Sequence, residues 1–142
     1  MYEAIRTKSV HSTPAASDFP HRSREEELDI QLAGHLAALL AVTDELRGTA
    51  PDPDLDAAAE RLAGQVARLR GGRPPVRAVP AASGDPVRLH RRAHTLAGRA
   101  LVVAASRADT GAAILAAERM DAHAPDPSEQ GPAAPRQLSA AR

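Results

Sequence analysis

Leucines recur at helical spacing through the first half of the chain, and each run of them ends at glycine or proline. The first run predicts a helix over residues 23–47, with one side made of Leu28, Leu32, Leu36, Leu39, Thr43 and Leu46. Ser23 and Glu26 have the spacing of a capping box at its start. Gly48 is expected to end this helix.

A second amphipathic segment predicts a helix over residues 53–70. Asp52 is placed as its N-cap and Pro53 as its first residue. Its apolar side consists of Leu55, Ala59, Leu62, Val66 and Leu69. The segment 71–85 that follows is rich in proline and glycine, so it predicts a linker that is either a crossover connection or a flexible spacer.

The pair Asp85-Pro86 repeats the same start and predicts a helix over residues 86–107. Its apolar side alternates large and small residues at intervals of four and three: Leu89, Ala93, Leu96, Ala100 and Val103. Continued without a break, this side would bury Arg107 and Glu118. We therefore predict a break at 107–110, with Asp109 capping a helix over 110–123; a single helix over 86–123 is the alternative.

Together these segments predict an all-α protein, a small antiparallel bundle of three to four helices within residues 23–124. The segments 1–22 and 125–142 show no periodicity, and we expect them to be disordered tails. Gly34, Gly64 and Gly98 fall inside predicted helices, where glycine costs stability. Close approach of neighbouring backbones is the expected reason.

Composition limits what such a bundle can do. Alanine accounts for 32 of the 142 residues, so the core is thin and a homodimer would bury more apolar surface. The chain has no cysteine, which excludes disulfides, thiolate metal sites and cysteine nucleophiles. Its two aromatic residues, Tyr2 and Phe19, lie in the N-terminal arm, where they would anchor a partner or occur by chance. With no apolar run long enough for a signal peptide or a membrane span, we expect a cytoplasmic protein.

Charge is divided unevenly along a chain whose net charge is zero. Residues 21–60 carry ten acids against three arginines, a balance of −7, and residues 61–107 carry ten arginines against Asp85, a balance of +9. The helix over 86–107 and the linker thus predict a basic interaction face made of Arg88, Arg91, Arg92, Arg99, Arg73 and Arg77. Three interpretations stay open: the acidic and basic helices neutralise each other, the face binds an acidic protein, or it binds nucleic acid.

His90 and His94 lie four residues apart on one helix, the spacing with which many zinc sites begin. Arg91 and Arg92 lie between them, and two fixed positive charges oppose a bound metal cation. Glu118, Asp121 and His123 would have to converge from the last helix to complete a site. We therefore favour packing of both histidines at the rim of the apolar side, and we assign no metal site.

No pattern in the chain indicates catalysis or a cofactor. No serine lies in a strand–turn–helix context suited to a nucleophile, and "RGGRPP" lacks the lysine and spacing of a phosphate-binding loop. We therefore expect a non-enzymatic protein.

Three segments, "MYEAIRTKSVH", "FPHRSREEELDIQLAGHLAALL" and "AASRADTGAAILAAERMDAHA", resemble an uncharacterised family of small streptomycete (actinobacterial) proteins. The resemblance implies a soluble actinobacterial protein and brings no activity, cofactor or site residue with it. The sequence thus predicts a protein–protein interaction or accessory regulatory module. The alternative is a nucleic-acid-associated regulator that uses the arginines of the helix over 86–107.

Overall fold

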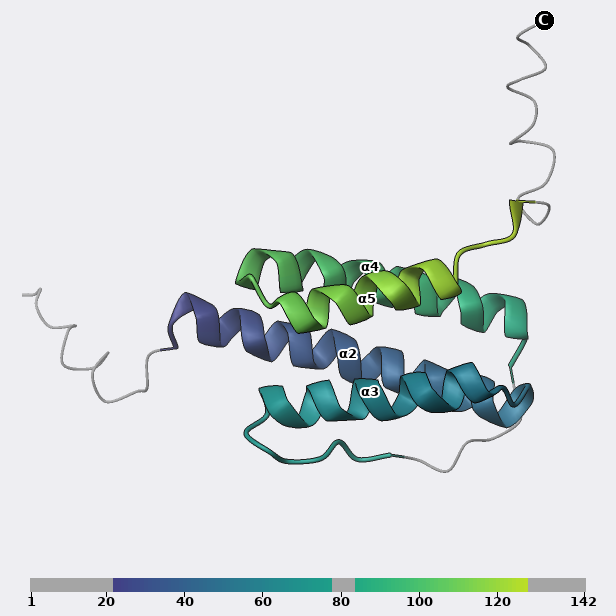
Figure 1. Cartoon of the computed structure of the whole chain (residues 1–142), viewed down its shortest axis with the longest axis horizontal. Helices are drawn as coiled ribbons and strands as arrows, with labels where there is room; N and C mark the ends of the chain where they lie inside the picture. The colour runs from purple at the N-terminus through teal and green to yellow at the C-terminus, as the bar shows by residue number, and fades with distance from the viewer. Residues whose placement is uncertain (1–21, 78–83, 128–142) are drawn as a thin grey trace, which may run out of the picture.

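The computed structural model describes residues 22–77 and 84–127, and every regular element longer than one turn in them is an α-helix. In chain order these are α2 (Arg24–Thr49), α3 (Pro53–Leu69), α4 (Pro86–Arg107) and α5 (Thr110–Ala122) (Figure 1). The predicted all-α bundle is therefore confirmed, with four helices in the described part. The predicted tails lie outside the described residues, apart from residue 22 and residues 125–127, and so do both aromatic residues.

The predicted helix starts are confirmed atom by atom. Ser23 Oγ accepts a hydrogen bond from the Glu26 amide at 3.0 Å, and Glu26 Oε1 accepts one from the Ser23 amide at 2.8 Å. Asp52 and Asp85 each accept an amide hydrogen bond from the residue two positions later, ahead of the prolines that open α3 and α4. Side-chain oxygens thus satisfy amides that a helix start leaves free.

The predicted end of the first helix is wrong by two residues. α2 continues through Gly48 to Thr49, whose hydroxyl donates a hydrogen bond to the Glu45 carbonyl at 3.1 Å. The helix ends at Ala50 because that residue precedes Pro51, and proline disfavours helical backbone in the residue before it. Glycine inside a helix is tolerated at a cost, whereas the residue before proline sets a steric limit.

The break between α4 and α5 is confirmed, and the single long helix is excluded. Ala108 adopts a left-handed conformation with φ of 59°. The Asp109 amide then donates to the Ala104 carbonyl at 2.9 Å, while the Asp109 side chain accepts from the Ala112 amide at 3.2 Å. One residue, Asp109, therefore closes α4 and caps α5.

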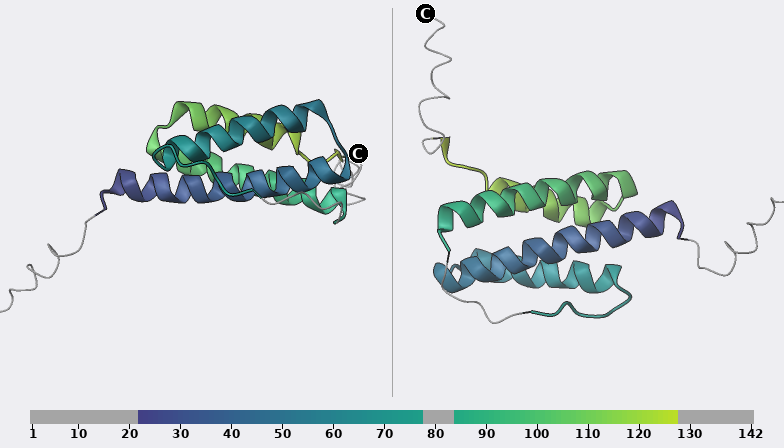
Figure 2. Two further views of the ribbon diagram at one scale, coloured as in Figure 1. Left: turned by 90° about the horizontal axis from the view of Figure 1, so that it is seen from below. Right: turned by 180° about the vertical axis from the view of Figure 1, so that it is seen from behind.

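The four helices form two layers, with α2 beside α4 in one and α3 beside α5 in the other (Figure 2). The contacts of α2 with α3, of α2 with α4 and of α4 with α5 are extensive, whereas α3 and α5 touch only slightly. The Arg107–Asp29 ion pair places the end of α4 at the start of α2, and Arg68–Asp109 places the start of α5 at the end of α3. Neighbouring helices are thus antiparallel.

α3 and α4 run in the same direction, so the predicted linker, of which residues 78–83 lie outside the described residues, is a crossover connection between opposite ends of the bundle. Its described residues pass back along α2 and α3, where Arg77 pairs with Asp44 and Glu60. Figure 1 shows the described part of the linker, which ends at residue 77, running beneath α3.

The core is built from the predicted apolar sides together with many alanines. All six predicted α2 positions are buried, as are Leu62 and Val66 of α3 and Leu89 and Leu96 of α4. The expected close approach at glycine is not found: a Cβ added at Gly34 or Gly64 would meet nothing within 4 Å, and one added at Gly98 would make only ordinary contact with Met120. Alanine, with its small side chain, instead lets the helices approach each other.

Candidate interaction face

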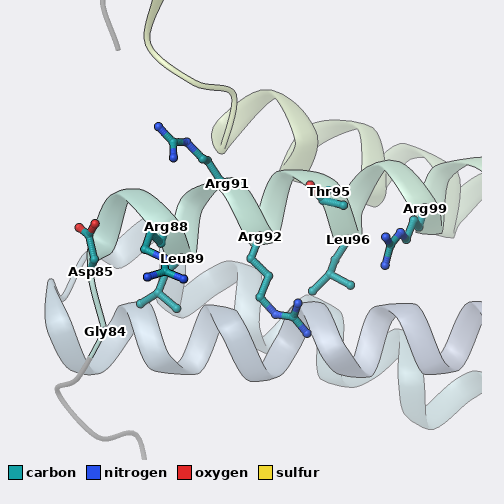
Figure 3. Close-up of a pocket in the computed structure, with 9 residues that line it drawn as sticks. All are labelled: Gly84, Asp85, Arg88, Leu89, Arg91, Arg92, Thr95, Leu96 and Arg99. Carbon is teal, nitrogen blue, oxygen red and sulfur yellow. The ribbon is translucent and has the colours of Figure 1, made fainter. Parts of the chain in front are cut away.

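Four exposed arginines lie along the first two thirds of α4: Arg88, Arg91, Arg92 and Arg99. We call this set the arginine face. It follows from the register of the helix, since Leu89, Ala93, Leu96 and Ala100 turn inward to the core and leave the positions between them to the arginines. Figure 3 shows Arg88, Arg92 and Arg99 on the side of α4 that faces α2, while Arg91 points away from α2.

A hollow of about 500 Å³ lies within the arginine face. Besides the arginines, its lining consists of Gly84, Asp85, Leu89, Thr95 and Leu96. Gly84 has φ of +93°, and a Cβ there would come within 3.5 Å of the Leu89 side chain. A glycine at this position therefore lets the linker turn closely over Leu89 into α4. The hollow thus combines a charged rim with leucine side chains at its base.

None of the four arginines makes an ion pair with a residue in the part of the chain that the structure describes. Other arginines there do: Arg22, Arg47, Arg61, Arg68, Arg77, Arg107 and Arg119 each lie within 4 Å of a carboxylate oxygen. The first turn of α4 contains no acid and is preceded only by its N-cap, Asp85. A positive side chain in the first turn of a helix opposes the helix dipole, so Arg88, the arginine of the four that lies there, does not stabilise α4 through that dipole.

The structure places the two linker arginines elsewhere. Arg73 is exposed before the crossover. Arg77 donates two hydrogen bonds to Asp44, from Nε at 3.0 Å and from Nη2 at 2.9 Å. Burial alone would raise the pKa of Asp44, but hydrogen bonds from Arg77 and Arg47 outweigh it and lower that pKa. Arg77 therefore holds the crossover to α2, and the face is smaller than the sequence indicates.

Mutual neutralisation of the acidic and basic helices is realised only in part. α2 and α4 do lie side by side, but a single ion pair joins them, Arg107 to Asp29 at 3.0 Å, far along α4 from the arginine face. The arginines of α3 pair instead with α5 and its cap, as Arg61–Glu118 and Arg68–Asp109. The arginines of α4 between residues 88 and 99 form no ion pair with the described residues, although Asp85 lines the same hollow.

His90 and His94 fasten α4 to the end of α5. His94 Nδ1 donates to the Met120 carbonyl at 3.0 Å, a group that the end of α5 leaves free. His90 Nδ1 lies 2.8 Å from His123 Nδ1, and Arg119 Nη2 lies 3.3 Å from His123 Nε2. A guanidinium can only donate, so His123 accepts at Nε2 and donates from Nδ1 to His90.

This network matches the rim-packing interpretation of the two histidines. α5 does fold back on α4, yet Glu118 pairs with Arg61 and Asp121 is exposed. Residues 22–77 and 84–127 contain no group of three or more histidine, cysteine or acidic side chains placed to hold a metal ion. The histidine spacing thus serves the contact between two helices.

Arg119 of α5 and His123, the C-cap of that helix, are buried polar residues that the sequence analysis does not place in the core. Arg119 is only 3% exposed, pairs with Asp54 at 3.1 Å, and leaves its Nε without a hydrogen-bond partner among the described residues. His123 is 2% exposed, and burial, with the charge of Arg119 beside it, lowers its pKa to about 4. Both continue the buried side of Leu115 at helical spacing, which is the signal that would have revealed them.

No helix within the described ranges has the length and apolar character needed to cross a membrane. Comparison with protein-family models, with curated proteins and with solved structures finds no match for this chain. Function is therefore inferred from the side chains and their surroundings.

Proposed function

We propose that this protein is a non-enzymatic, cytoplasmic interaction module whose arginine face binds an acidic protein partner. The observation that carries the proposal is the row of exposed arginines on α4 that have no acidic counterpart among the described residues. Positive charge that forms no ion pair within the fold, arranged along one helix, attracts a ligand of opposite sign and orients it.

The alternative is a nucleic-acid-associated regulator, because a row of arginines also suits phosphate groups. The hollow at the centre of the face favours a protein. Its base is formed by Leu89 and Leu96, and the aliphatic stems of the arginines add to its apolar lining, which an apolar side chain covers better than a phosphate backbone does. The described residues also contain no phenylalanine, tyrosine or tryptophan on which an unpaired base would stack.

Two matched variants test this proposal. The face variant carries Arg88→Gln, Arg92→Gln and Arg99→Gln. The control variant carries Arg24→Gln, Arg70→Gln and Arg73→Gln, which remove the same charge from arginines that also lack an ion pair among the described residues but lie off α4. Glutamine preserves helix propensity and polarity, so both variants should fold.

The experiment is affinity purification of the tagged full chain from its native cells, with and without nuclease. We expect an acidic protein that co-purifies with the native chain and the control variant, survives nuclease, and is lost with the face variant. Recovery that is equal for all three chains, or that disappears on nuclease treatment, would contradict the proposal.

A further inference from the structure

We propose that the partner of the arginine face is an acidic amphipathic α-helix that lies lengthwise along α4 over the hollow. This inference rests on the proposed function and names the chemistry of its partner. It follows from the spacing of the arginines, the base of the hollow and the absence of a competing mode of peptide binding in the described residues.

The arginines define a straight line of positive charge. Arg88, Arg92 and Arg99 are separated by intervals of four and seven, which return to the same side of a helix. At 1.5 Å per residue they span about 16 Å along the axis of α4. A partner helix with carboxylates at the same intervals presents negative charge with the same spacing, because both helices have the same rise.

The hollow requires more than charge. Leu89 and Leu96 are almost fully buried by the fold and form its base, between the stems of the surrounding arginines. Apolar side chains between the carboxylates of the partner would cover the apolar lining of the hollow, to which the stems of the arginines contribute beside these two leucines. The occupant is therefore amphipathic, because a ligand with charged groups alone would leave the hollow unfilled.

A helix fits better than an extended peptide. The described residues contain no β-strand, so an extended peptide would find no sheet edge with which to form a ladder of backbone hydrogen bonds. A helix satisfies its own backbone and binds through side chains, as amphipathic helices do in grooves. The N-terminal end of α4 adds the positive end of its dipole to the charge that the partner meets.

The acidic start of α2 cannot occupy this face within the same molecule. Glu25, Glu26 and Glu27 lie at the end of α2 that meets the end of α4, as the Arg107–Asp29 ion pair shows. The arginine face lies at the other end of α4. We therefore assign the acidic helix to another molecule and not to α2 of the same chain.

The test uses two helical peptides of about 20 residues with identical composition of alanine, leucine and glutamate. In the striped peptide the glutamates repeat at intervals of four and seven beside a row of leucines; in the scrambled peptide they are distributed around the helix. Binding of each peptide, and of duplex DNA, to the full native chain, the face variant and the control variant is measured by fluorescence anisotropy at two salt concentrations. Circular dichroism checks that each variant is folded, and sedimentation gives its mass.

We expect the striped peptide to bind the native chain about tenfold more tightly than the scrambled one, and the face variant to lose about tenfold in affinity. The control variant should stay within about twofold of the native chain. Equal binding of the two peptides, weakened in the face variant, would overturn the helical partner and leave the proposed function standing. Preference for duplex DNA, or no effect of the face variant on either peptide, would overturn both. A native dimer that the face variant converts to a monomer would show that a second copy occupies the face, and would overturn this inference.

Discussion

His123 is a histidine that the fold keeps uncharged. Arg119 donates to one of its ring nitrogens, and the other donates to His90. The groups that face it are Arg119 on its own helix, His90 and His94 on α4, and Asp54 at the start of α3. Only Asp54 favours a proton on His123. A protonated ring would present a donor to the Arg119 guanidinium inside the core, which burial makes costly.

The free energy of unfolding should therefore fall in mild acid. The pKa of His123 is lowered from 6.5 to about 4 in the folded chain, so below pH 6.5 the unfolded chain binds a proton that the folded chain does not. The contribution of uncharged His123 to the free energy of unfolding is fully present above pH 6.5. It decreases as the pH falls toward 4, and about 2 to 3 kcal/mol of it is lost at pH 4.5. Urea titrations of the native chain and His123→Gln at pH 7 and pH 4.5 measure this loss. The free energy of unfolding of His123→Gln should fall by about 2 to 3 kcal/mol less than that of the native chain. Equal losses in the two proteins would refute the lowered pKa of His123.

Ala108 is the one described residue other than glycine with positive φ. Glycine adopts this conformation without a steric penalty, so Ala108→Gly should stabilise the protein by about 1 kcal/mol. Ala105→Gly, the same change three residues earlier on an exposed position of α4, should destabilise it by about 1 kcal/mol. Chemical denaturation gives both values. A loss of stability in both variants would show that the break at 108 is not closed in this way.

Among the elements, the crossover depends most on tertiary contacts. Its proline and glycine content shows that it is not helical, and the sequence leaves open whether it is a crossover or a spacer. The Asp44–Arg77 pair holds the described part of the linker against α2, and it joins residues that are 33 positions apart in the sequence. The helices themselves could be predicted because caps and apolar periodicity are local. The end of α2 lies two residues beyond the predicted one, because two local signals for a helix end, Gly48 and Pro51, lie close together there.

Arg77→Gln should lower the free energy of unfolding by about 1 to 3 kcal/mol, because buried Asp44 then keeps only Arg47 as a charged partner. Arg73→Gln, four residues earlier in the same linker, should change it by less than about 0.5 kcal/mol. Denaturation midpoints in urea compare the two. If the two variants were equally stable, the Asp44–Arg77 pair would not hold the crossover.

At the scale of the whole molecule, charge separates into two groups. Ion pairs join α3 to α5, α2 to α3 and the ends of α2 and α4, while the first two thirds of α4 keep their arginines free of ion pairs with described residues. The sequence indicates the basic segment but not this division, because pairing depends on which helix ends meet. For the same reason the sequence alone indicates neither that Arg77 pairs with Asp44 nor that Arg119 and His123 are buried.

Because paired and unpaired arginines lie in different parts of the fold, we expect substitutions in the arginine face to weaken binding without lowering the free energy of unfolding. The face variant should unfold at the same or a slightly higher urea concentration than the native chain, because it breaks no ion pair among the described residues and removes the charge of Arg88 from the positive end of the α4 dipole. Arg61→Gln with Arg68→Gln, which removes two paired arginines, should lower the midpoint slightly, since exposed pairs contribute about 0.2 to 1 kcal/mol each. A large loss of stability in the face variant would mean that these arginines support the fold.

The most direct test of the binding claim is a nuclear magnetic resonance titration of the full, ¹⁵N-labelled chain with the striped peptide. If the striped peptide binds the arginine face, the largest shifts will occur at the backbone amides of residues 85–99 and at the Nε–H groups of Arg88, Arg92 and Arg99. Shifts centred on Arg70 and Arg73, or no shift at a peptide excess that saturates binding, would contradict it.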